Sequence, residues 1–447
     1  MDKQAFIAAV RAAGIVGEGG AGFPAHVKYA AEADTVIANG CECEPLLHTD
    51  QHHMLHHARD IVRALDELKQ AVGARRAVIG LKRKYKEATN ILAEAIRAAG
   101  SSIELALLDN FYPAGDEQTL VREVTGRSVP PLGLPLQVGA VVANVGTLVS
   151  VARALDGAPL TRKTLTVTGE VQKPGLVGAP VGAPMTACLE AAGGARVKDP
   201  VFILGGPMMG RLVDSLEKLA AEVVTKTSGG LIVLPRGHYL HRNATLPVEH
   251  MRRRAAAACI QCRSCSDLCP RHLLGHLFET HRVMRAFGAG METESENGKL
   301  ALLCCDCGVC EHVACPMGLS PRRINQAVKA ELRAASVSYD GSREVNEDYT
   351  RWRESRRVAV PRLVARIGVA RYMDLPMNDL GEIDPAEVRI PLRQHIGAPA
   401  QAVVKAGDHV AAGDVIGEIP DKALGARIHA SIAGSVRSVG DAVIIGR

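Results

Sequence analysis

Nine of the twelve cysteines in this chain fall into two short runs, and this clustering constrains the fold more than any other feature of the sequence. The first run, CIQCRSCSDLCP, begins at Cys259 and has the spacing C-x2-C-x2-C-x3-C-P, which ligates 4Fe-4S clusters. The second run, CCDCGVCEHVACP, repeats the C-x2-C-x2-C triplet from Cys304 and ends in a Cys-Pro pair. Paired C-x2-C motifs also bind zinc, but two triplets with two Cys-Pro pairs suit two cubane clusters better. The sequence therefore predicts a pair of iron–sulfur clusters.

The spacing also predicts which cysteines share a cluster. In proteins that hold two such clusters, the fourth cysteine of a run ligates the cluster of the other run. Each predicted cluster then takes three ligands from one run and one from the other. The first set is Cys259, Cys262, Cys265 and Cys315, and the second set is Cys304, Cys307, Cys310 and Cys269. Cys305 is left over, because only one residue separates it from Cys307.

Cysteine usage and charge limit the class of protein. Cysteines gathered in one region do not resemble the disulfide framework of a secreted fold. The first residues lack the apolar core of a signal peptide, and no run of about 18 apolar residues could span a bilayer. We therefore expect a reduced, cytoplasmic protein. A net charge of +5 is small for 447 residues, and the only dense basic run, residues 252–254, lacks interleaved aromatic residues, so nucleic acid is not an expected partner.

Several polar and glycine-rich loops in the N-terminal third predict a ligand site. GEGGAGFP, residues 17–24, is a glycine-rich loop with Lys28 close behind, a combination that can accept a phosphate group. The apolar stretch TVIA runs into a polar loop at Asn39, and VGAVVA runs into Asn144. Loops at the carboxyl ends of strands are where open α/β sheets bind their ligands.

These motifs carry a family resemblance. GEGGAGFPAHVKY, NGCECEP, AGDEQTL and NVGTL, in this order, resemble the FMN- and NADH-binding domain of the flavoprotein subunit of respiratory complex I. The GGPMMG segment, the two cysteine runs and the C-terminal module resemble more specifically the RnfC proteins and the PduS-type cobalamin reductases. RnfC proteins carry a barrel-sandwich domain before the flavin domain. Here a comparable β module comes last, and this order, together with CECEPLLHTDQ, resembles the PduS-type family.

The resemblance implies a set of site residues. The expected cofactor contacts are Gly19, Gly20, Ala21, Gly22, Lys28, Asn39, Glu44, Asp116 and Asn144. Glu42 and Glu117 are the expected catalytic carboxylates. The chain departs from the complex I pattern at Glu18, which replaces an arginine, and at Cys41 and Cys43, which replace aspartate and serine.

Two other groups of reactive side chains are interpreted as structural rather than functional. Cys41 and Cys43 form a C-x-C pair beside the expected flavin, and we interpret them as small packing residues. A histidine-rich segment contains two i, i+4 pairs on an expected helix but has no flanking carboxylate pattern. Its members are His48, His52, His53, His56 and His57. We interpret this segment as a solvated helix rather than a metal site.

The expected fold class is a multidomain α/β and α+β protein. Residues 1–160 form an FMN- and NADH-binding α/β domain, and residues 161–243 a soluble-ligand-binding β-grasp (SLBB) domain. Residues 244–335 form a helical ferredoxin domain with two 4Fe-4S clusters, in which HLLGHLFETHRVMRAFGAG predicts one helix. Residues 336–385 form a connecting arm, and residues 386–447 a barrel-sandwich, lipoyl-like β domain.

The chemistry joins these parts into one function. NADH releases two electrons together, a cubane cluster accepts one, and a flavin can handle both. We therefore expect an NADH-dependent oxidoreductase that passes single electrons from FMN through two 4Fe-4S clusters to an acceptor. The resemblance implies that the acceptor is cobalamin or a corrinoid enzyme within a bacterial microcompartment, with shell proteins or other enzymes as further partners. The alternative is an RnfC-like electron-transfer adaptor without NADH activity of its own.

Overall fold

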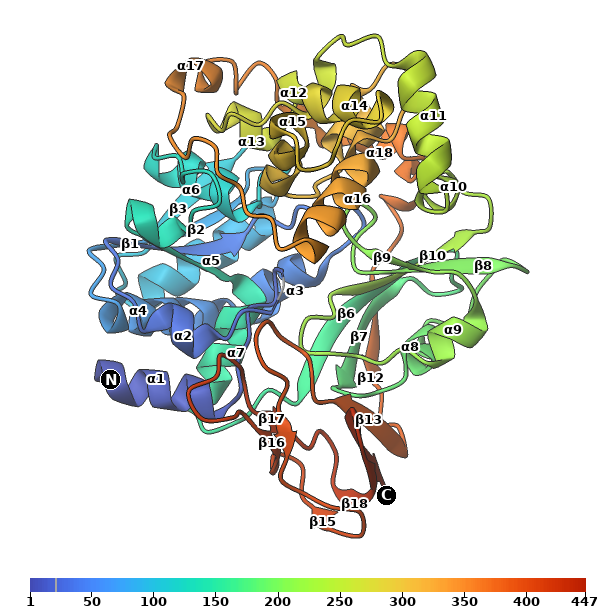
Figure 1. Ribbon diagram of the computed structural model, residues 1–447. Helices are drawn as coiled ribbons and strands as arrows, with labels where there is room; N and C mark the ends of the chain where they lie inside the picture. Colours follow the sequence, from blue (N-terminus) through green and yellow to red (C-terminus); the bar gives the residue numbers. More distant parts are fainter. Residues whose placement is uncertain (21) are drawn as a thin grey trace.

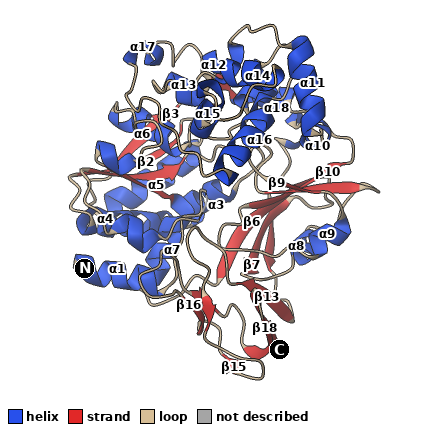
Figure 2. Ribbon diagram, in the orientation of Figure 1, coloured by secondary structure: helices blue, strands red, loops and turns tan. Residues whose placement is uncertain are grey.

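The computed structural model describes residues 1–20 and 22–447 (Figures 1 and 2). Ala21, one of the predicted FMN contacts, lies outside the described residues. None of the helices in those two ranges is long and apolar enough to cross a membrane.

A parallel four-stranded sheet in the order β3-β2-β1-β5 organises the N-terminal part. Its strands are β1 (Thr35–Gly40), β2 (Arg76–Lys82), β3 (Glu104–Leu108) and β5 (Ala140–Asn144). The helices around it are α1 (Lys3–Ala12), α2 (Ala25–Tyr29), α3 (Thr49–His56), α4 (Ala58–Ala71), α5 (Lys86–Ala98), α6 (Glu117–Thr125) and α7 (Val145–Leu155). The two central strands are almost wholly buried, as expected of parallel strands covered by helices.

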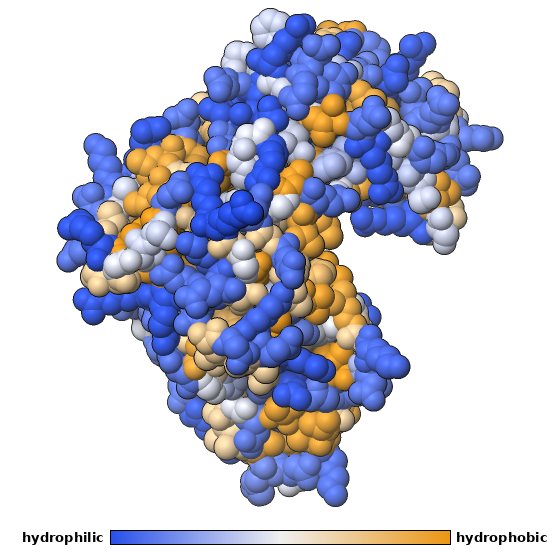
Figure 3. All heavy atoms as spheres, turned by 90° about the vertical axis from the view of Figure 1, so that its left-hand side faces the viewer, coloured by the Kyte–Doolittle hydropathy of each residue, from blue (hydrophilic) through white to orange (hydrophobic). Residues whose placement is uncertain are grey.

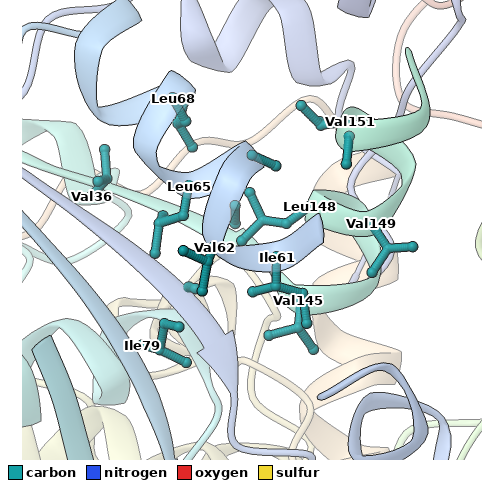
Figure 4. Close-up of a cluster of buried hydrophobic side chains, with 14 of the residues drawn as sticks. Val36, Ile61, Val62, Leu65, Leu68, Ile79, Val145, Leu148, Val149 and Val151 are labelled. Atoms are coloured by element: carbon teal, nitrogen blue, oxygen red, sulfur yellow. The ribbon is translucent and has the colours of Figure 1, made fainter. Parts of the chain in front are cut away.

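The core of this part forms where α4 and α7 pack on the sheet. Helix α4 repeats apolar residues at helical spacing, so one face of the helix is buried. Figure 4 shows this face meeting α7 and the central strands. The side chains involved are Val36, Ile61, Val62, Leu65, Leu68, Ile79, Val145, Leu148, Val149 and Val151. The packing holds the carboxyl ends of β1 and β5 next to the N-terminus of α7.

The second part is built on a six-stranded sheet in the order β12-β7-β6-β10-β8-β9. Its strands are β6 (Arg162–Gly169), β7 (Gly175–Pro180), β8 (Pro200–Leu204), β9 (Arg211–Val213), β10 (Gly230–Pro235) and β12 (Asn378–Glu382), with helices α8 (Met185–Ala191) and α9 (Leu216–Ala220). The edge strand β12 comes from the segment expected as a connecting arm. The same segment forms β11 (Val358–Ala359), which pairs with β4 (Phe111–Tyr112), and α18 (Val360–Arg366), which buries Leu363. It is therefore part of the packed structure as well as a connection.

Short helices carry the two cysteine runs at the top of the molecule in Figure 1. They are α10 (Tyr239–Ala244), α11 (Val248–Ala258), α12 (Ser264–Asp267), α13 (Pro270–Leu273), α14 (Thr280–Gly288), α15 (Glu296–Lys299), the 3₁₀ helix η2 (Leu300–Leu303), the π-helix η3 (Cys310–Ala314), α16 (Pro321–Ala334) and α17 (Glu347–Thr350). The single helix expected between the runs is wrong, because the chain breaks between α13 and α14. Gly275 in the break has φ +92, and a Cβ there would lie 2.6 Å from Val345 Cγ1. Helix α14 begins only after this turn.

Two small sheets, in the orders β13-β19-β18-β15 and β14-β16-β17, form the C-terminal part at the bottom of Figure 1. Their strands are β13 (Glu387–Pro391), β14 (Gln401–Ala402), β15 (His409–Val410), β16 (Val415–Glu418), β17 (Ile428–His429), β18 (Gly434–Val439) and β19 (Ala442–Gly446). Buried Lys226 ties this part to the rest, since its Nζ donates to the carbonyl oxygens of Gly14, at 2.7 Å, and Arg427. Burial lowers the pKa of Lys226 to about 7.

The face in Figure 3 mixes hydrophilic and hydrophobic areas, and its outline is notched between the upper and lower parts of the molecule.

Candidate redox sites

Two asparagines mark the carboxyl edge of the parallel sheet. Asn39 is the next-to-last residue of β1 and lies opposite Asn144 of β5 in the strand register. The Asn39 side chain donates to the Gly115 carbonyl at 2.8 Å and accepts from the Cys41 amide at 3.1 Å, so it holds two loops together. Asn144 caps α7 by accepting from the Gly146 amide at 2.7 Å. The structure thus brings these two predicted contacts to one edge of the sheet, where a ligand of this fold is expected.

A cluster of carboxylates lies beside the asparagines. Asn144 Nδ2 donates to both oxygens of Asp50, at 3.2 and 3.0 Å, and the Asp50 amide donates to Glu42 Oε2 at 3.1 Å. Burial raises the pKa of Glu42 to about 7, and burial together with the Glu42 carboxylate raises the pKa of Asp50 well above its ordinary value. Lys82, almost fully buried at the end of β2, donates to the Glu42 carbonyl at 2.8 Å. This cluster of buried side chains can hold a proton near neutral pH.

Asp50 and Lys82 were not predicted from the sequence. Asp50 lies among the histidines of the HTDQHH segment, and such a segment suggests metal binding rather than a flavin site. Lys82 could have been predicted from the sequence, because a lysine at the end of an apolar parallel strand indicates a site at the carboxyl edge of the sheet.

The glycine loop approaches this edge. A Cβ added to Gly19 would lie 3.4 Å from the Asn144 Cβ, whereas a Cβ added to Gly20 would meet nothing within 4 Å. Gly19 therefore lies against Asn144 and the neighbouring Gly20 borders open space, as a glycine loop that cradles a phosphorylated flavin requires. Gly22 has another role. Its φ is +72, and a Cβ there would press on Thr227 and His395, so it packs against the other parts of the chain.

We expect Gly20→Val to weaken FMN binding without harming the fold. The valine occupies the open space at Gly20 where the flavin phosphate is expected, and overpacking against the bound flavin costs about 1–3 kcal/mol, which corresponds to a roughly 5- to 150-fold higher Kd for FMN. Fluorescence titration of the flavin-free protein measures this change, and the melting temperature should stay constant. Gly440→Val is the matched control, because Gly440 also borders open space but lies in the C-terminal part. Equal FMN affinity in both variants would contradict the assignment.

Lys28 and Glu117 form one contact pair. Lys28 Nζ donates to Glu117 Oε1 at 2.6 Å and to the Val142 carbonyl of β5 at 2.9 Å. Both side chains are partly exposed. The pair contacts β5 two residues before Asn144, and the predicted cofactor lysine and the predicted catalytic carboxylate are brought together.

Asp116 faces the iron–sulfur part instead. It caps α6 by accepting from the Thr119 amide at 3.0 Å. Arg271, two residues after the last cysteine of the first run, donates to both Asp116 oxygens at 2.6 and 2.8 Å. Burial alone would raise the pKa of Asp116, but the guanidinium of Arg271 holds the pKa below its ordinary value. This largely buried ion pair joins the N-terminal part to the cysteine-bearing helices.

Glu44 also reaches another part of the chain. Its Oε2 accepts from the Met208 amide of the GGPMMG loop at 2.8 Å, while its Oε1 is buried without a hydrogen-bond partner among the described residues. A Cβ on Gly206 would overlap the Glu44 side chain, so this position of the loop requires glycine. Burial raises the pKa of Glu44 to about 7.

We expect the stability of the protein to depend on pH through Glu44. Between pH 4.5 and about 7 the unfolded chain ionises this carboxyl while the folded chain keeps it protonated, so stability from this group is present at low pH and is lost as pH rises to about 7. Glu44→Gln removes this dependence. The free energy of unfolding of the variant minus that of wild type should rise by up to about 2 kcal/mol from pH 5 to pH 7.5. Urea denaturation at the two pH values measures this change. A constant difference at both pH values would contradict the assignment.

Glu18, which replaces the arginine of complex I, forms a buried ion pair with Lys163 of β6. Ser150 Oγ donates to its Oε1 at 2.9 Å. The pair lines a cavity of about 570 Å³ between α3, α7 and β6, together with His53 and Arg153. Helix α3 carries the histidine-rich segment, but in residues 1–20 and 22–447 no three His, Cys, Asp or Glu side chains are placed to hold a single metal ion.

The first predicted cysteine set lines a small cavity of about 20 Å³. The lining thiols are Cys259, Cys262, Cys265 and Cys315. Burial and the thiols of Cys259 and Cys315 raise the pKa of Cys265 to about 12, so the cysteine from the second run lies beside the first triplet. Four free thiols around one cavity fit a cubane cluster.

The second set is enclosed. Burial raises the pKa of Cys310 well above its ordinary value, and the thiols of Cys304 and Cys269 add to the shift, which places Cys269 of the first run beside the second triplet. Cys305 hydrogen-bonds to Cys307, and this bond lowers the pKa of Cys305 to about 7.

The two sets differ in their surroundings. Tyr112, which is fully buried, donates to the Cys307 carbonyl at 2.8 Å. Cys307 and Tyr112 share one apolar cluster with Met208 and Leu46, so the second set lies against the parts that carry the carboxylates. In the first set, Cys262 is exposed. The second set therefore faces the junction between the cysteine-bearing helices and the rest of the chain, and the first set faces the surface.

Four family models match the chain. They are the Nuo51 FMN-binding domain at residues 10–153, the SLBB domain at 164–212, the 4Fe-4S dicluster domain at 258–320 and the RnfC barrel sandwich hybrid domain at 379–446. They confirm the predicted fold class and the predicted FMN and 4Fe-4S cofactors.

Curated relatives match nearly the whole chain. Cobalamin reductase PduS of Citrobacter freundii is 43% identical over 440 residues, which are 98% of this chain and 95% of that protein. The PduS of Salmonella typhimurium is 44% identical over 97% of this chain and 94% of that protein. A component of the Na⁺-translocating ferredoxin:NAD⁺ oxidoreductase complex of Acetobacterium woodii is 34% identical over 61% of this chain and 59% of that protein. The crystal structure of an air-oxidised NAD⁺-reducing [NiFe]-hydrogenase aligns with a TM-score of 0.48 and 24% identity, over 82% of this chain and 67% of that chain.

Proposed function

The chain belongs to the family of the cobalamin reductase PduS, and from this premise we propose that it is an NADH-dependent oxidoreductase that delivers single electrons to a corrinoid. One observation carries the proposal: a flavin-binding edge and two four-cysteine sets meet within a single chain, with Tyr112 joining the two. Bound FMN would accept two electrons together from NADH and release them singly, and bound clusters carry one electron each.

We assign the side chains of the flavin edge to three tasks. Gly19 and Gly20 would let the backbone approach the flavin phosphate, and Asn39 and Asn144 would hold the surrounding loops in place. Glu42, whose pKa of about 7 suits proton transfer at neutral pH, would hold a proton at Oε1 or Oε2.

Lys28 and Glu117 would orient the bound dinucleotide, since their side chains are the accessible charges on this edge. We assign Glu44 to the boundary between this pocket and the GGPMMG loop. Asp116 would act through its contact with Arg271, by fixing the distance between the flavin edge and the second cysteine set.

The partners follow from the same proposal. NADH would be the electron donor, and a free corrinoid or a corrinoid enzyme would be the acceptor, in keeping with the names of the relatives. We place the protein in the cytoplasm, inside a bacterial microcompartment, where shell proteins or other enzymes would be neighbours.

The buried Glu18–Lys163 pair favours a second candidate. Glu18 takes the position of the complex I arginine and is neutralised by Lys163, so the glycine loop lacks the positive charge of that arginine for the expected FMN phosphate, which would weaken flavin binding. A chain with a weakened flavin site would serve as an electron-transfer adaptor in a larger complex, in the manner expected of an RnfC-like protein. The partial match to a component of an ion-translocating complex is compatible with this candidate.

One experiment separates the two candidates. The full chain is purified without oxygen, its clusters and FMN are restored, and NADH oxidation is followed with ferricyanide and with aquacobalamin as acceptors. The enzyme proposal expects NADH oxidation with both acceptors, dependent on added FMN. A protein that holds iron and sulfide at full occupancy but oxidises no NADH would be the adaptor.

A further inference from the structure

Several exposed apolar side chains lie beside the exposed cysteine set. Ile260, between the first two cysteines of the set, has 63% of its surface exposed, and Met317, two residues after Cys315, has 42% exposed. Ala256, Ala257 and Pro316 are also exposed. We call these five residues, together with the cavity that Ile260, Pro316 and Met317 line, the Ile260 face. Grouped exposed apolar side chains mark sites of protein interaction more often than single ones.

Arginines surround the Ile260 face. Arg254 donates to the Met317 carbonyl at 3.5 Å, and Arg263 lines the cavity itself. Arg263 and Arg282 share Glu279 as their acidic partner. The side chain of Glu279 is only 14% exposed, whereas those of Arg263 and Arg282 are 48% and 56% exposed. The guanidinium groups, and not the carboxylate, therefore face the solvent.

The second cysteine set offers no comparable surface among the described residues, because Cys269, Cys307 and Cys310 are buried. Arg271 and Tyr112 hold that set against the flavin-binding part. A protein that exchanges electrons with the chain through the cysteine-bearing helices can thus approach most closely at the Ile260 face, at the end of the molecule opposite the C-terminal sheets (Figure 1).

We infer that the Ile260 face is the docking site for a protein electron acceptor with an acidic surface. The inference depends on the proposed function in one respect only, because it requires that electrons leave the chain. An apolar centre ringed by arginines is the usual composition of a specific interface, and it suits a partner with an apolar spot ringed by carboxylates. Exposed charges at the rim raise the association rate with a partner of opposite charge and make binding weaken as salt rises.

Flavodoxin, an acidic one-electron carrier, is the probe. Cytochrome c, which is basic, is the comparison protein of opposite charge. Binding of each to the iron-loaded full chain is measured by surface plasmon resonance at low and high salt. The test variant is Arg254→Glu with Arg282→Glu, which leaves the neighbours of the cysteine ligands unchanged. The control variant is Arg59→Glu with Arg97→Glu, two exposed arginines on α4 and α5.

Wild type and the control should bind flavodoxin with equal affinity, weakened by salt, and the test variant should bind it about 10-fold more weakly or worse. Iron content and NADH oxidation with ferricyanide should be unchanged, which shows that the fold and flavin site are intact. Cytochrome c should not prefer wild type over the test variant. Absence of flavodoxin binding, or equal loss in both variants, overturns the inference. The ferricyanide assay needs no docked protein, so it tests the proposed function independently of the docking inference.

Discussion

The variant Cys315→Ser is expected to lose the cluster of the first cysteine set and keep that of the second. Cys315 belongs to the second run but lines the cavity of Cys259, Cys262 and Cys265. A serine hydroxyl is a poor ligand for iron, so the iron content should fall from about eight to about four atoms per chain. Metal analysis and electron paramagnetic resonance of the dithionite-reduced protein measure the loss. Because the lost cluster is the exposed one, electron delivery to a protein acceptor should fall to background while flavin content is retained.

Pairs of substitutions identify which cysteines act together. Cys315→Ser combined with Cys265→Ser should lose no more iron than either alone, since both change the same cluster. Cys315→Ser combined with Cys310→Ser should lose nearly all iron. If that second pair instead kept half of the iron, each run would hold its own cluster and the crosswise assignment would be wrong. Cys188→Ser is the control, because Cys188 lies buried in α8, outside both sets.

Local patterns made the cluster ligands predictable. Three of the four ligands in each set lie within a few residues of one another, so their spacing alone defines the geometry. The same holds for Asn39 and Asn144, each of which follows an apolar strand whose end can be read from the sequence. The positions of residues that depend on their own element were therefore predictable from the sequence, while their roles as ligands stay predictions.

Contacts between distant segments were not predictable in this way. The hydrogen bond from the Met208 amide to Glu44 spans 164 residues, and no local pattern records it. Glu18 shows the same limit, because its departure from the complex I pattern was visible but its partner Lys163 was not. The raised pKa of Glu42 also depends on burial by several segments, which periodicity does not report.

Two differences between the structure and the expectations from the sequence have physical causes. The segment around Gly275 keeps the apolar spacing of a helix, but the close approach of Val345 and Asn346 requires a turn there. The segment expected as a connecting arm ends in β12, whose pairing with β7 completes the edge of the six-stranded sheet. The charged residues that indicated a linker lie earlier in this segment, at residues 338–357, so the composition gave no sign of the strand near its end.

The junction between the flavin-binding part and the cysteine-bearing helices should be the most sensitive place in the molecule to a single substitution. Arg271→Ala leaves the Asp116 carboxylate largely buried without its bidentate partner, and breaking such a pair costs about 3–5 kcal/mol. The free energy of the first unfolding transition in urea, measured on iron-loaded protein, should fall by that amount. Arg271→Lys should recover part of the loss, since it restores the charge but only one hydrogen bond.

The double variant Asp116→Asn with Arg271→Met decides whether the loss reflects an unpaired charge. It removes both charges, so it should be more stable than Arg271→Ala alone. The double variant should still transfer electrons more slowly from FMN to the clusters, because the Asp116–Arg271 pair would also set the position of the second cysteine set relative to the flavin edge. Single-turnover reduction by NADH, followed at the absorbance of the clusters, measures this rate. A loss below about 1 kcal/mol in Arg271→Ala, with an unchanged rate in the double variant, would mean that Tyr112 and the apolar cluster around Cys307 hold the junction without the ion pair.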